Sequence, residues 1–189
     1  MPSYWDRFSG VYTGVGRADF WLKHRLRLIE GLSGRVLEAC CGGGQLVLEM
    51  LRQGIDAYGI DRSEKVVTQS KRHLEQAGFD PTRIARGDVT ELSFPNDHFD
   101  AVVVTGAIGL FQPEKQQVAI REMARVTKRE LRLLEPFEKR PGLYSARVLG
   151  WMFDGQHPIP LAYFTEAGLV CRVEWDILWG VFSFIYCTK

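Results

Sequence analysis

The sequence predicts an α/β fold: one doubly wound sheet of seven strands, mostly parallel, that ends in an antiparallel hairpin. Short apolar runs alternate along the chain with amphipathic segments of helical period, which is typical of parallel strands joined by right-handed helical crossovers. The last two β-rich runs are separated by only three residues, too few for a crossover, so they predict an antiparallel pair. With 189 residues, 46% of them hydrophobic, the chain is long enough for one domain with a single sizeable core.

Each expected strand is an apolar or β-branched run bounded by turn residues. The strands are expected near residues 36–37, 57–60, 82–86, 99–105, 131–134, 170–177 and 181–186. The fourth of these runs is continuously apolar, which indicates burial on both faces of the sheet.

The expected helices are marked by apolar residues at i, i+4 spacing and by residues that begin or end helices. Ser63 is a predicted N-cap, Pro113 opens a helix, and Gly78 and Gly168 follow helix ends. The helices are expected near residues 44–53, 63–77, 113–126 and 162–167. An amphipathic segment before Arg35, carrying Trp21, Leu22, Leu26 and Ile29, predicts a further helix that could cross a ligand pocket as a lid.

Composition and charge exclude several classes of partner. The net charge of +1 provides no overall attraction to nucleic acid or to a membrane surface. The uncharged stretch at residues 177–188 is shorter than the roughly 20 apolar residues that span a bilayer, and residues 1–7 lack the apolar core of a signal peptide. We therefore expect neither a transmembrane segment nor a nucleic-acid partner. One basic group along a helix and its exit is expected to be a solvated face: Arg121, Arg125, Lys128, Arg129 and Arg132.

The four cysteines, Cys40, Cys41, Cys171 and Cys187, have spacings that match neither a zinc site nor a disulfide framework. Reduced thiols in a cytoplasmic protein are the simplest interpretation, because disulfides are rare in that compartment. No metal site is expected.

Acidic residues and glycines follow the ends of the first three predicted strands, in an order typical of a pocket for a nucleoside-bearing cofactor. Glu38 ends the first strand and is followed by the glycine turn 42–44, whose backbone can approach a ligand closely. Asp61 ends the second strand, where a carboxylate can accept both hydroxyls of a ribose. Asp88 follows the third and can accept from an adenine amine. Glu38 needs a partner if its strand is buried, and a cationic amino group is a good one.

Other interpretations of these residues stay open. A run of three glycines also occurs in purely structural turns, and Asp88 is equally well a solvated turn residue or an N-cap. Dinucleotide binding is a competing function, since Gly42 and Gly44 fit the first two positions of G-x-G-x-x-G. Val47 occupies the third position, where glycine normally permits close packing of helix on strand, and this argues against NAD.

The chain resembles the class I S-adenosylmethionine-dependent methyltransferases, in particular the small-molecule branch with the ubiquinone- and menaquinone-biosynthesis C-methyltransferases. Residues 36–44, VLEACCGGG, are similar to the family motif V-L-E/D-x-G-C-G-x-G. Residues 58–63 resemble its G-x-D-x-S segment, residues 87–95 its G-D-x-x-x-L-P-F segment, and residues 99–103 its F-D-x-V strand. The resemblance covers nearly the whole chain and implies a Rossmann-like sheet. Two departures are Cys40 in place of a glycine and the absence of a Lys-Pro-Gly-Gly turn at residues 126–130.

By position, the resemblance implies a site for S-adenosylmethionine, with S-adenosylhomocysteine as the product. The implied cofactor residues are Tyr12, Glu38, Gly42, Gly44, Asp61, Arg62, Asp88, Val89, Thr105 and Gly106. Glu38 would hold the methionine amino group, and Tyr12 would reach the carboxylate end. The glycines and the end of the fourth strand would border the methionine part. Asp61 would bind the ribose, and the other three would lie around the adenine.

A bound sulfonium is already activated, so the protein mainly has to hold a nucleophile in line with the methyl group and exclude water. A general base is needed only if the nucleophile must lose a proton. The apolar segment 107–111 and the aromatic loop 137–160 predict a small, partly hydrophobic acceptor. Tyr144 and His157 are candidate catalytic residues, although a lone histidine before a proline is more often a loop hydrogen-bonder.

We therefore expect a single methyltransferase domain: an N-terminal helical lid at 1–33, a cofactor-binding core at 34–135, and a substrate loop with the hairpin at 136–189. The alternative from another class is a non-catalytic S-adenosylmethionine-binding subunit that regulates or supports a partner. The oligomeric state and the acceptor atom are left open.

Overall fold

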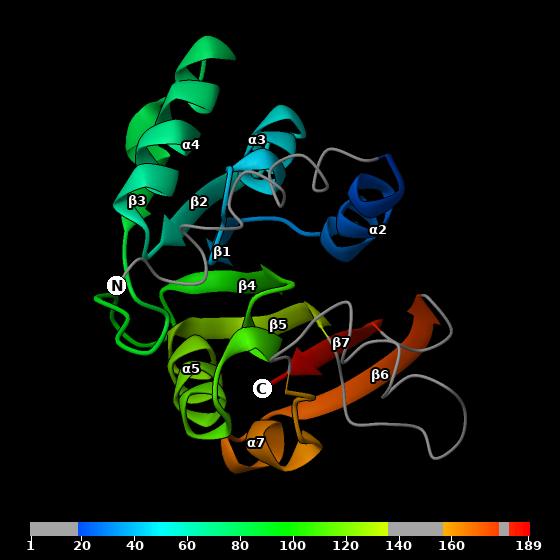
Figure 1. Cartoon of the computed structure of the whole chain (residues 1–189). Helices are drawn as coiled ribbons and strands as arrows, with labels where there is room; N and C mark the ends of the chain where they lie inside the picture. The colour runs from blue at the N-terminus through cyan, green and yellow to red at the C-terminus, as the bar shows by residue number, and fades with distance from the viewer. Residues whose placement is uncertain (1–18, 136–156, 178–181) are drawn as a thin grey trace.

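The computed structural model describes residues 19–135, 157–177 and 182–189. They form one seven-stranded sheet with the order β3-β2-β1-β4-β5-β7-β6 (Figure 1). Strands β1 to β5 pair in parallel, whereas β7 is antiparallel to both β5 and β6. The strands are β1 Arg35–Ala39, β2 Asp56–Asp61, β3 Ile84–Arg86, β4 Phe99–Thr105, β5 Thr127–Glu135, β6 Val170–Ile177 and β7 Phe182–Thr188. The predicted fold class is confirmed, including the change of direction in strand order at β1 and β4.

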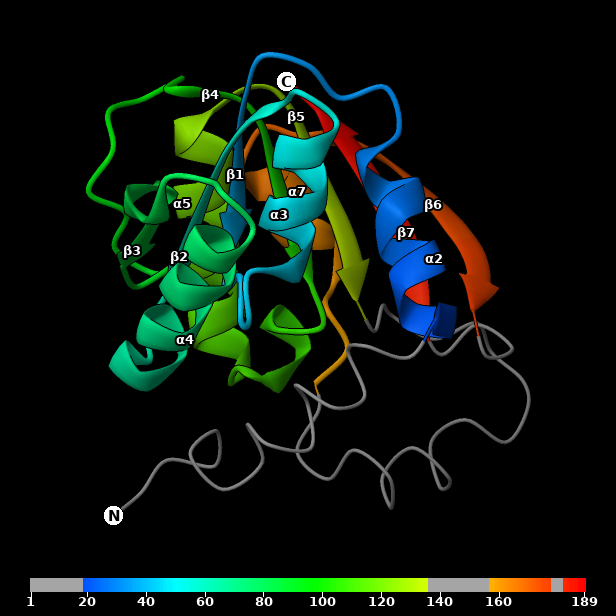
Figure 2. The same cartoon turned by 90° about the horizontal axis from the view of Figure 1, so that it is seen from above.

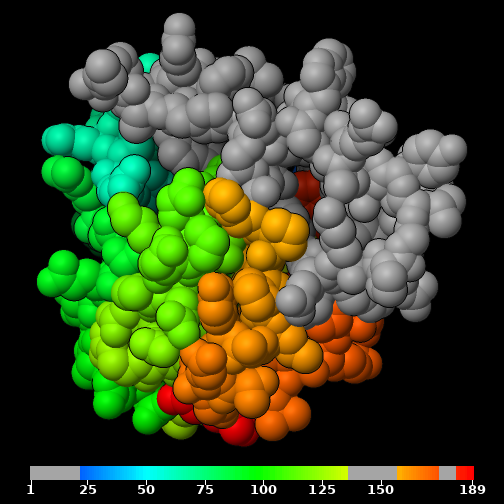
Figure 3. Space-filling model, turned by 60° about the horizontal axis from the view of Figure 1, so that its bottom comes forward, coloured from blue at the N-terminus to red at the C-terminus, as the bar shows by residue number. Residues whose placement is uncertain are grey.

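Helices cover both faces of the sheet (Figure 2). They are α2 Asp19–Ile29, α3 Gln45–Arg52, α4 Glu64–Gln76, α5 Pro113–Val126 and α7 Leu161–Glu166, with single 3₁₀ turns η1 Pro81–Arg83 and η2 Ile108–Leu110. Helices α2, α3 and α4 bury apolar side chains such as Leu28 and Leu74 against one face. Helices α5 and α7 bury Met123 and Phe164 against the other, where they lie side by side (Figure 3).

The helix-boundary residues behave as predicted. The Ser63 hydroxyl accepts a hydrogen bond from the Val66 amide at 3.4 Å, which caps α4, and Pro113 is the first residue of α5. Gly78 and Gly168 follow α4 and α7 with φ angles of +80° and +77°, a backbone region that glycine enters without steric cost. Within the described ranges, no helix is long and apolar enough to cross a membrane.

Two elements differ from their predicted bounds. The third strand is shorter than expected, because the Asp80 carboxylate accepts a hydrogen bond from the Thr82 amide at 2.8 Å and thereby starts the turn η1 instead. The fifth strand is longer and begins directly after α5, where the Thr127 hydroxyl donates to the Met123 carbonyl at 2.6 Å. The helix therefore passes into the strand without a separate turn, and the missing Lys-Pro-Gly-Gly segment is not needed.

Helix α2 is part of the layer that covers the sheet. Leu28 and Ile29 are buried in the core shared with α3. Arg27 bonds Glu174 of β6 at 2.6 Å and lies over the Phe184 ring of β7, which ties the helix to the hairpin. The predicted helix is confirmed by this packing, whereas residues 1–18 of the predicted lid lie outside the described residues.

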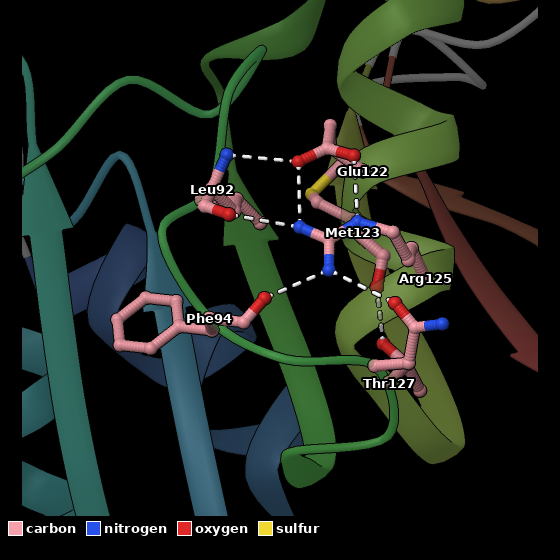
Figure 4. A network of polar contacts seen from close by, with 7 residues as sticks. Leu92, Phe94, Glu122, Met123, Arg125 and Thr127 are labelled. Atoms are coloured by element: carbon pink, nitrogen blue, oxygen red, sulfur yellow. Dashed lines mark hydrogen bonds and ion pairs between the residues drawn. The ribbon is translucent and has the colours of Figure 1, made fainter.

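Part of the basic group is not the solvated face that the sequence predicted. The Arg125 guanidinium donates to the carbonyls of Leu92 and Phe94 at 2.8 and 2.7 Å and is paired with Glu122 (Figure 4). Arg132 likewise donates to two backbone carbonyls, those of Leu28 in the last turn of α2 and of Glu30 just after it. These arginines were mistaken for surface charges because their carbonyl acceptors lie about 30 and 100 residues away in sequence.

The cysteine prediction was wrong for one pair, since Cys171 and Cys187 form a disulfide. They lie directly opposite each other in the register of β6 and β7. The prediction weighed sequence spacing alone, whereas a cross-strand disulfide depends on register. Ile177 is opposite Phe182, and a register shift between Trp175 and Ile177 brings Cys171 opposite Cys187, which the sequence spacing could not show.

Candidate cofactor site

The strand-end acids and glycines singled out in the sequence lie at one edge of the sheet, where the parallel strands end. Ala39 at the end of β1 is opposite Ile60 of β2 and Val104 of β4. Asp61 is opposite Arg86, the last residue of β3. The same edge of the sheet therefore carries the glycine turn, Asp61, Asp88 and Gly106, which lie at or just after the carboxyl ends of their strands. They lie on both sides of the topological switch, where ligands bind in doubly wound folds.

Two glycines at this edge border open space. Gly42 and Gly106 have φ angles of +52° and +62°, and a Cβ placed on either one would meet no atom of the described residues within 4 Å. Such backbone can lie flat against a ligand, so these positions fit a cradle for a bound molecule. Gly44 differs: its φ is +72°, and a Cβ there would lie 3.1 Å from the Ser70 side chain, so this glycine also permits packing against α4.

Two side chains of helix α4 contact backbone carbonyls of the glycine turn. The Ser70 hydroxyl, fully buried, donates to the Gly42 carbonyl at 2.5 Å, and a ring nitrogen of His73 lies 3.0 Å from the Gly43 carbonyl. The sequence analysis missed both residues. Their spacing of three places them on the same helix face, which is the only local signal they offered.

Cys40, which lies two residues before the glycine turn 42–44, has a strained backbone. Cys40 has a φ of +56°, a left-handed conformation that costs an L-residue roughly 1–2 kcal/mol. Burial raises the pKa of its thiol, and the nearby carboxylates Asp61, Glu135 and Asp88 raise it further. The Cys40 thiol is therefore protonated and a weak nucleophile near neutral pH.

The packing of α3 on β2 explains the valine in the third position of the glycine pattern. A Cβ on Gly59 of β2 would lie 2.8 Å from the Val47 side chain and 2.9 Å from the Cys41 sulfur. The glycine that permits close helix–strand contact is thus on the strand instead of the helix. Cys41 is buried in this contact, as expected for a packing residue.

Asp61 organises the turn as well as facing the site. One carboxylate oxygen accepts from the Gly42 amide at 3.0 Å and the other from the Ser63 amide at 2.9 Å. Each carboxylate oxygen has a second lone pair, so both can still accept a hydroxyl of a ligand. The half-buried side chain joins the glycine turn to the start of α4.

Asp88 forms a local turn of the kind that the sequence left open. Its Oδ1 accepts from the Thr90 amide at 2.9 Å and from the Thr90 hydroxyl at 2.7 Å. Burial opposes ionisation, but these bonds and the nearby Arg62 charge hold the pKa of Asp88 below its ordinary value. Val89 is buried beneath it in the core, while Arg62 is exposed.

Glu38 has a partner within the protein that the sequence analysis missed. Arg25 of α2 donates from Nη2 to one Glu38 oxygen at 2.8 Å, and the Val47 amide donates to the other at 3.2 Å. Burial raises the pKa of Glu38 to about 7, against the attraction of Arg25. Arg25 had been assigned only to a lid helix, and nothing in its spacing linked it to Glu38.

A second buried acid, Glu135 at the end of β5, shapes the turn after β4. Its carboxylate accepts from the amides of Ala107, Ile108 and Gly109 at 2.7, 3.1 and 3.1 Å. Burial raises its pKa to about 7, although these three bonds act in the opposite direction. In the sequence this residue was recognised only as the end of a strand.

The same turn is tied to the segment that begins at His157. The buried Gln116 side chain donates to the carbonyls of Ile108 and His157, and the His157 amide donates to the Gly109 carbonyl at 2.6 Å. His157 is thus placed by its backbone beside the turn after β4. Tyr12 and Tyr144 lie outside the described residues. Across the described part of the chain, no group of three potential ligands is arranged to hold a metal ion.

Taken together, the strand order, the antiparallel end of the sheet, the glycine cradle and the strand-end acids define an α/β domain of the class I methyltransferase type. The sequence agrees, because residues 36–130 match the model of a family described as "Methyltransferase domain", and the chain belongs to this family.

Curated relatives have names of the same kind. The chain is 30% identical over 138 residues to a phosphatidylethanolamine N-methyltransferase of Cereibacter sphaeroides, covering 67% of this chain and 66% of the relative. It is 29% identical over 131 residues to a demethylmenaquinone methyltransferase of Listeria innocua serovar 6a, covering 67% and 54%. The chain therefore spans between half and two thirds of the length of these relatives.

Solved structures show the same fold. A magnesium protoporphyrin IX methyltransferase from Synechocystis PCC 6803 with bound SAH superposes with a TM-score of 0.73 at 21% identity, covering 98% of this chain and 94% of that one. A Haloferax volcanii methyltransferase in complex with the Trm112 activator gives a TM-score of 0.76 at 15% identity, covering 100% and 98%.

Proposed function

We propose that this chain transfers the methyl group of S-adenosylmethionine to a small, partly hydrophobic acceptor. The observation that carries the proposal is the cradle at the sheet edge, where the open backbone of Gly42 and Gly106 lies on either side of the β1–β4 switch. The strand-end acids Asp61 and Asp88 are available beside it, and membership of the methyltransferase-domain family supports the same cofactor.

In this proposal each residue of the site has a defined task. Gly42, Gly44, Thr105 and Gly106 border the methionine part, and Glu38 attracts its amino group. Asp61 accepts the ribose hydroxyls through the lone pairs that its amide partners leave free. The adenine lies among Arg62, Asp88 and Val89. Tyr12 is proposed for the carboxylate end on the basis of the sequence resemblance alone.

When bound, the cofactor supplies an activated methyl group on a sulfonium. The chain's own residues then orient the two reactants and keep water away, which are the main requirements of such a transfer. Glu135 and Gln116 hold the turn 107–109 in one position beside the cradle. His157 and Tyr144 remain candidates for proton removal, in case the acceptor atom carries a proton at neutral pH.

The proposed acceptor class rests on the apolar residues of this turn. Ala107 and Ile108 are buried, and Leu110 and Phe111 are half-buried next to them, so this side of the site is apolar. The relatives are named for phosphatidylethanolamine and demethylmenaquinone, and these two compounds are the first acceptors to screen. A non-catalytic cofactor-binding subunit is not favoured, because the relatives are named as enzymes.

The test is calorimetric titration of S-adenosylmethionine and S-adenosylhomocysteine into the protein, with the Asp61→Ala variant. We expect binding by the wild type and an affinity at least tenfold lower in the variant, since two hydrogen bonds to a charged group are lost. Asp56→Ala is the matched control, because Asp56 lies at the opposite end of β2 and pairs with Arg83. A folded wild type that binds neither ligand would contradict the proposal.

The cytoplasmic location is a separate proposal. The bond between Cys171 and Cys187 argues against it, because that compartment keeps disulfides rare, so the state of these two cysteines in the cell, thiol or disulfide, is its test. Rapid alkylation of thiols in intact cells, followed by mass spectrometry, distinguishes the two states. A fully bonded pair in the cell would contradict a cytoplasmic location.

A further inference from the structure

The segment between β3 and β4 carries Asp88 and Val89 but belongs to neither strand. Residues 87–98 form no helix and only one isolated bridge, between Asp88 and Glu91. Buried backbone amides and carbonyls of such a segment have no strand partner, so they have to bond to side chains or water. Because Val89 and Leu92 are buried in the core, the groups that hold this backbone also decide where Asp88 lies.

Two side chains of α5 hold this backbone (Figure 4). The Glu122 carboxylate accepts from the Leu92 amide at 2.8 Å. Arg125 donates to the carbonyls of Leu92 and Phe94 at 2.8 and 2.7 Å. It also donates to the Asn96 side chain at 3.1 Å and twice to Glu122, each time at 2.8 Å. A guanidinium has five N–H donors, so every donor of Arg125 has an acceptor.

The same segment is bonded from Leu92 back to Asp88 and on to β2. The Glu91 amide, next to Leu92, donates to the Asp88 carbonyl at 3.0 Å and closes a turn. At the start of the segment, the Gly87 amide donates to the Asp61 carbonyl at 3.1 Å. The turn that carries Asp88 is therefore held between the end of β2 on one side and the two α5 side chains on the other.

The effect of the Glu122–Arg125 pair is geometric more than energetic. The two side chains are 23% and 31% exposed, and an ion pair that water reaches adds little to stability by itself. Water could also satisfy the amide of Leu92 and the carbonyls of Leu92 and Phe94, but it would not fix where they lie. The planar fork of the guanidinium fixes its acceptors in one arrangement.

We propose that Glu122 and Arg125 are a positioning pair for the base end of the cofactor site, which holds Asp88 in place to accept from the adenine amine. The inference rests on the proposed function, in which Asp88 lies beside the adenine. Neither member of the pair contacts the ligand, because both act through the backbone of Leu92. A hydrogen bond of about 2.9 Å is lost at about 3.6 Å, so a small shift of the turn removes the contact.

The test uses two ligands that differ in one group only. S-adenosylhomocysteine carries the 6-amino group of adenine, and its analogue has hydrogen in that place. Their dissociation constants are measured by calorimetry for the wild type, Arg125→Met and Arg125→Lys. Arg121→Met is the matched control, because Arg121 is on the same helix but pairs with Glu166 of α7 at 3.5 Å.

We expect the wild type to bind S-adenosylhomocysteine about ten- to a hundredfold more tightly than the analogue, the range for a hydrogen bond to a charged group. In Arg125→Met this preference should fall to less than about threefold, because Asp88 is no longer held against the amine. Arg125→Lys keeps the charge but not the fork, so it should show an intermediate preference. Arg121→Met should keep the preference of the wild type.

A double-mutant cycle separates positioning from a general loss of stability. Asp88→Ala should abolish the preference for the amine in the wild type. In the Arg125→Met background the same substitution should leave the small remaining preference unchanged, because the two residues act on one contact. Additive effects of the two substitutions on the preference would contradict the inference.

An unchanged preference in Arg125→Met, with both ligands weakened by the same factor, would show a merely structural role and overturn the inference. If only Arg125→Lys folds, an unchanged preference in that variant would do the same. The inference would also be overturned if the wild type bound both ligands equally well, although the proposed function would then stand. A folded wild type that bound neither ligand would overturn the function and the inference together.

Discussion

Replacement of Glu135 by glutamine should change how the stability of this protein depends on pH. Glu135 is fully buried, and its oxygens accept from three successive backbone amides. Burial disfavours the carboxylate and the three amides favour it. Because burial dominates, the pKa rises from 4.5 to about 7.

The magnitude follows from that difference. The interval between 4.5 and about 7 corresponds to roughly 3 kcal/mol, to order of magnitude. The folded state binds the Glu135 proton more tightly than the unfolded state does, so this contribution is fully present below pH 4.5 and is lost as the pH rises through about 7. Between pH 5 and pH 8, Glu135 should therefore lower the free energy of unfolding by about 2–3 kcal/mol.

The assay is urea unfolding of the wild type and Glu135→Gln at pH 5 and at pH 8. Glutamine does not titrate, so the difference between the two proteins removes the effect of every other ionisable group, including Glu38. The free energy of unfolding of the variant, minus that of the wild type, should be about 2–3 kcal/mol lower at pH 5 than at pH 8. Equal differences at the two pH values would refute the reasoning, since they would mean that the three amides fully offset burial.

Three further predictions concern the backbone and the cysteines. Cys40→Gly should raise the free energy of unfolding by up to about 1 kcal/mol, because glycine accepts the φ of +56° without strain. A lower free energy of unfolding, measured in urea, would contradict this. Replacing Cys171 and Cys187 by serine should cost about 3 kcal/mol, since their bond closes a loop of 16 residues; a thermal midpoint equal to that of the oxidised wild type would count against it. Gly59→Ala should lower the free energy of unfolding, measured by calorimetry, by about 1–3 kcal/mol, because the new Cβ would lie 2.8 Å from the Val47 side chain. An unchanged free energy of unfolding would contradict this and would mean that α3 moves away from the strand.

Much of the candidate site could be predicted because it lies where strands end. Asp61 and Asp88 are separated from their strands by no more than two residues, so a correct strand prediction also places the acids at the shared edge. The glycine turn is recognisable for the same reason. Which ligand groups these residues contact stays a prediction until binding is measured.

The partners of these residues could not be predicted in the same way. Glu38 was expected to need a cationic partner, but the Arg25 guanidinium comes from a helix 13 residues earlier in the chain. Glu135 looked like an ordinary strand end, and its role depends on amides more than 25 residues away. Hydrogen-bond partners at such separations have no periodic signal in the sequence.

The sequence by itself determined the order and type of the elements, the parallel sheet with its antiparallel end, and the edge at which a cofactor would bind. These properties follow from local periodicity, helix-boundary residues and the handedness of crossovers, all of which act within one or two neighbouring elements. Only the tertiary structure decided that Arg25 meets Glu38, that Arg125 holds the carbonyls before β4, and that Cys171 is bonded to Cys187. The physical reason is that buried charges, carbonyls and thiols take partners according to distance in the folded chain, and that distance is set by packing and register.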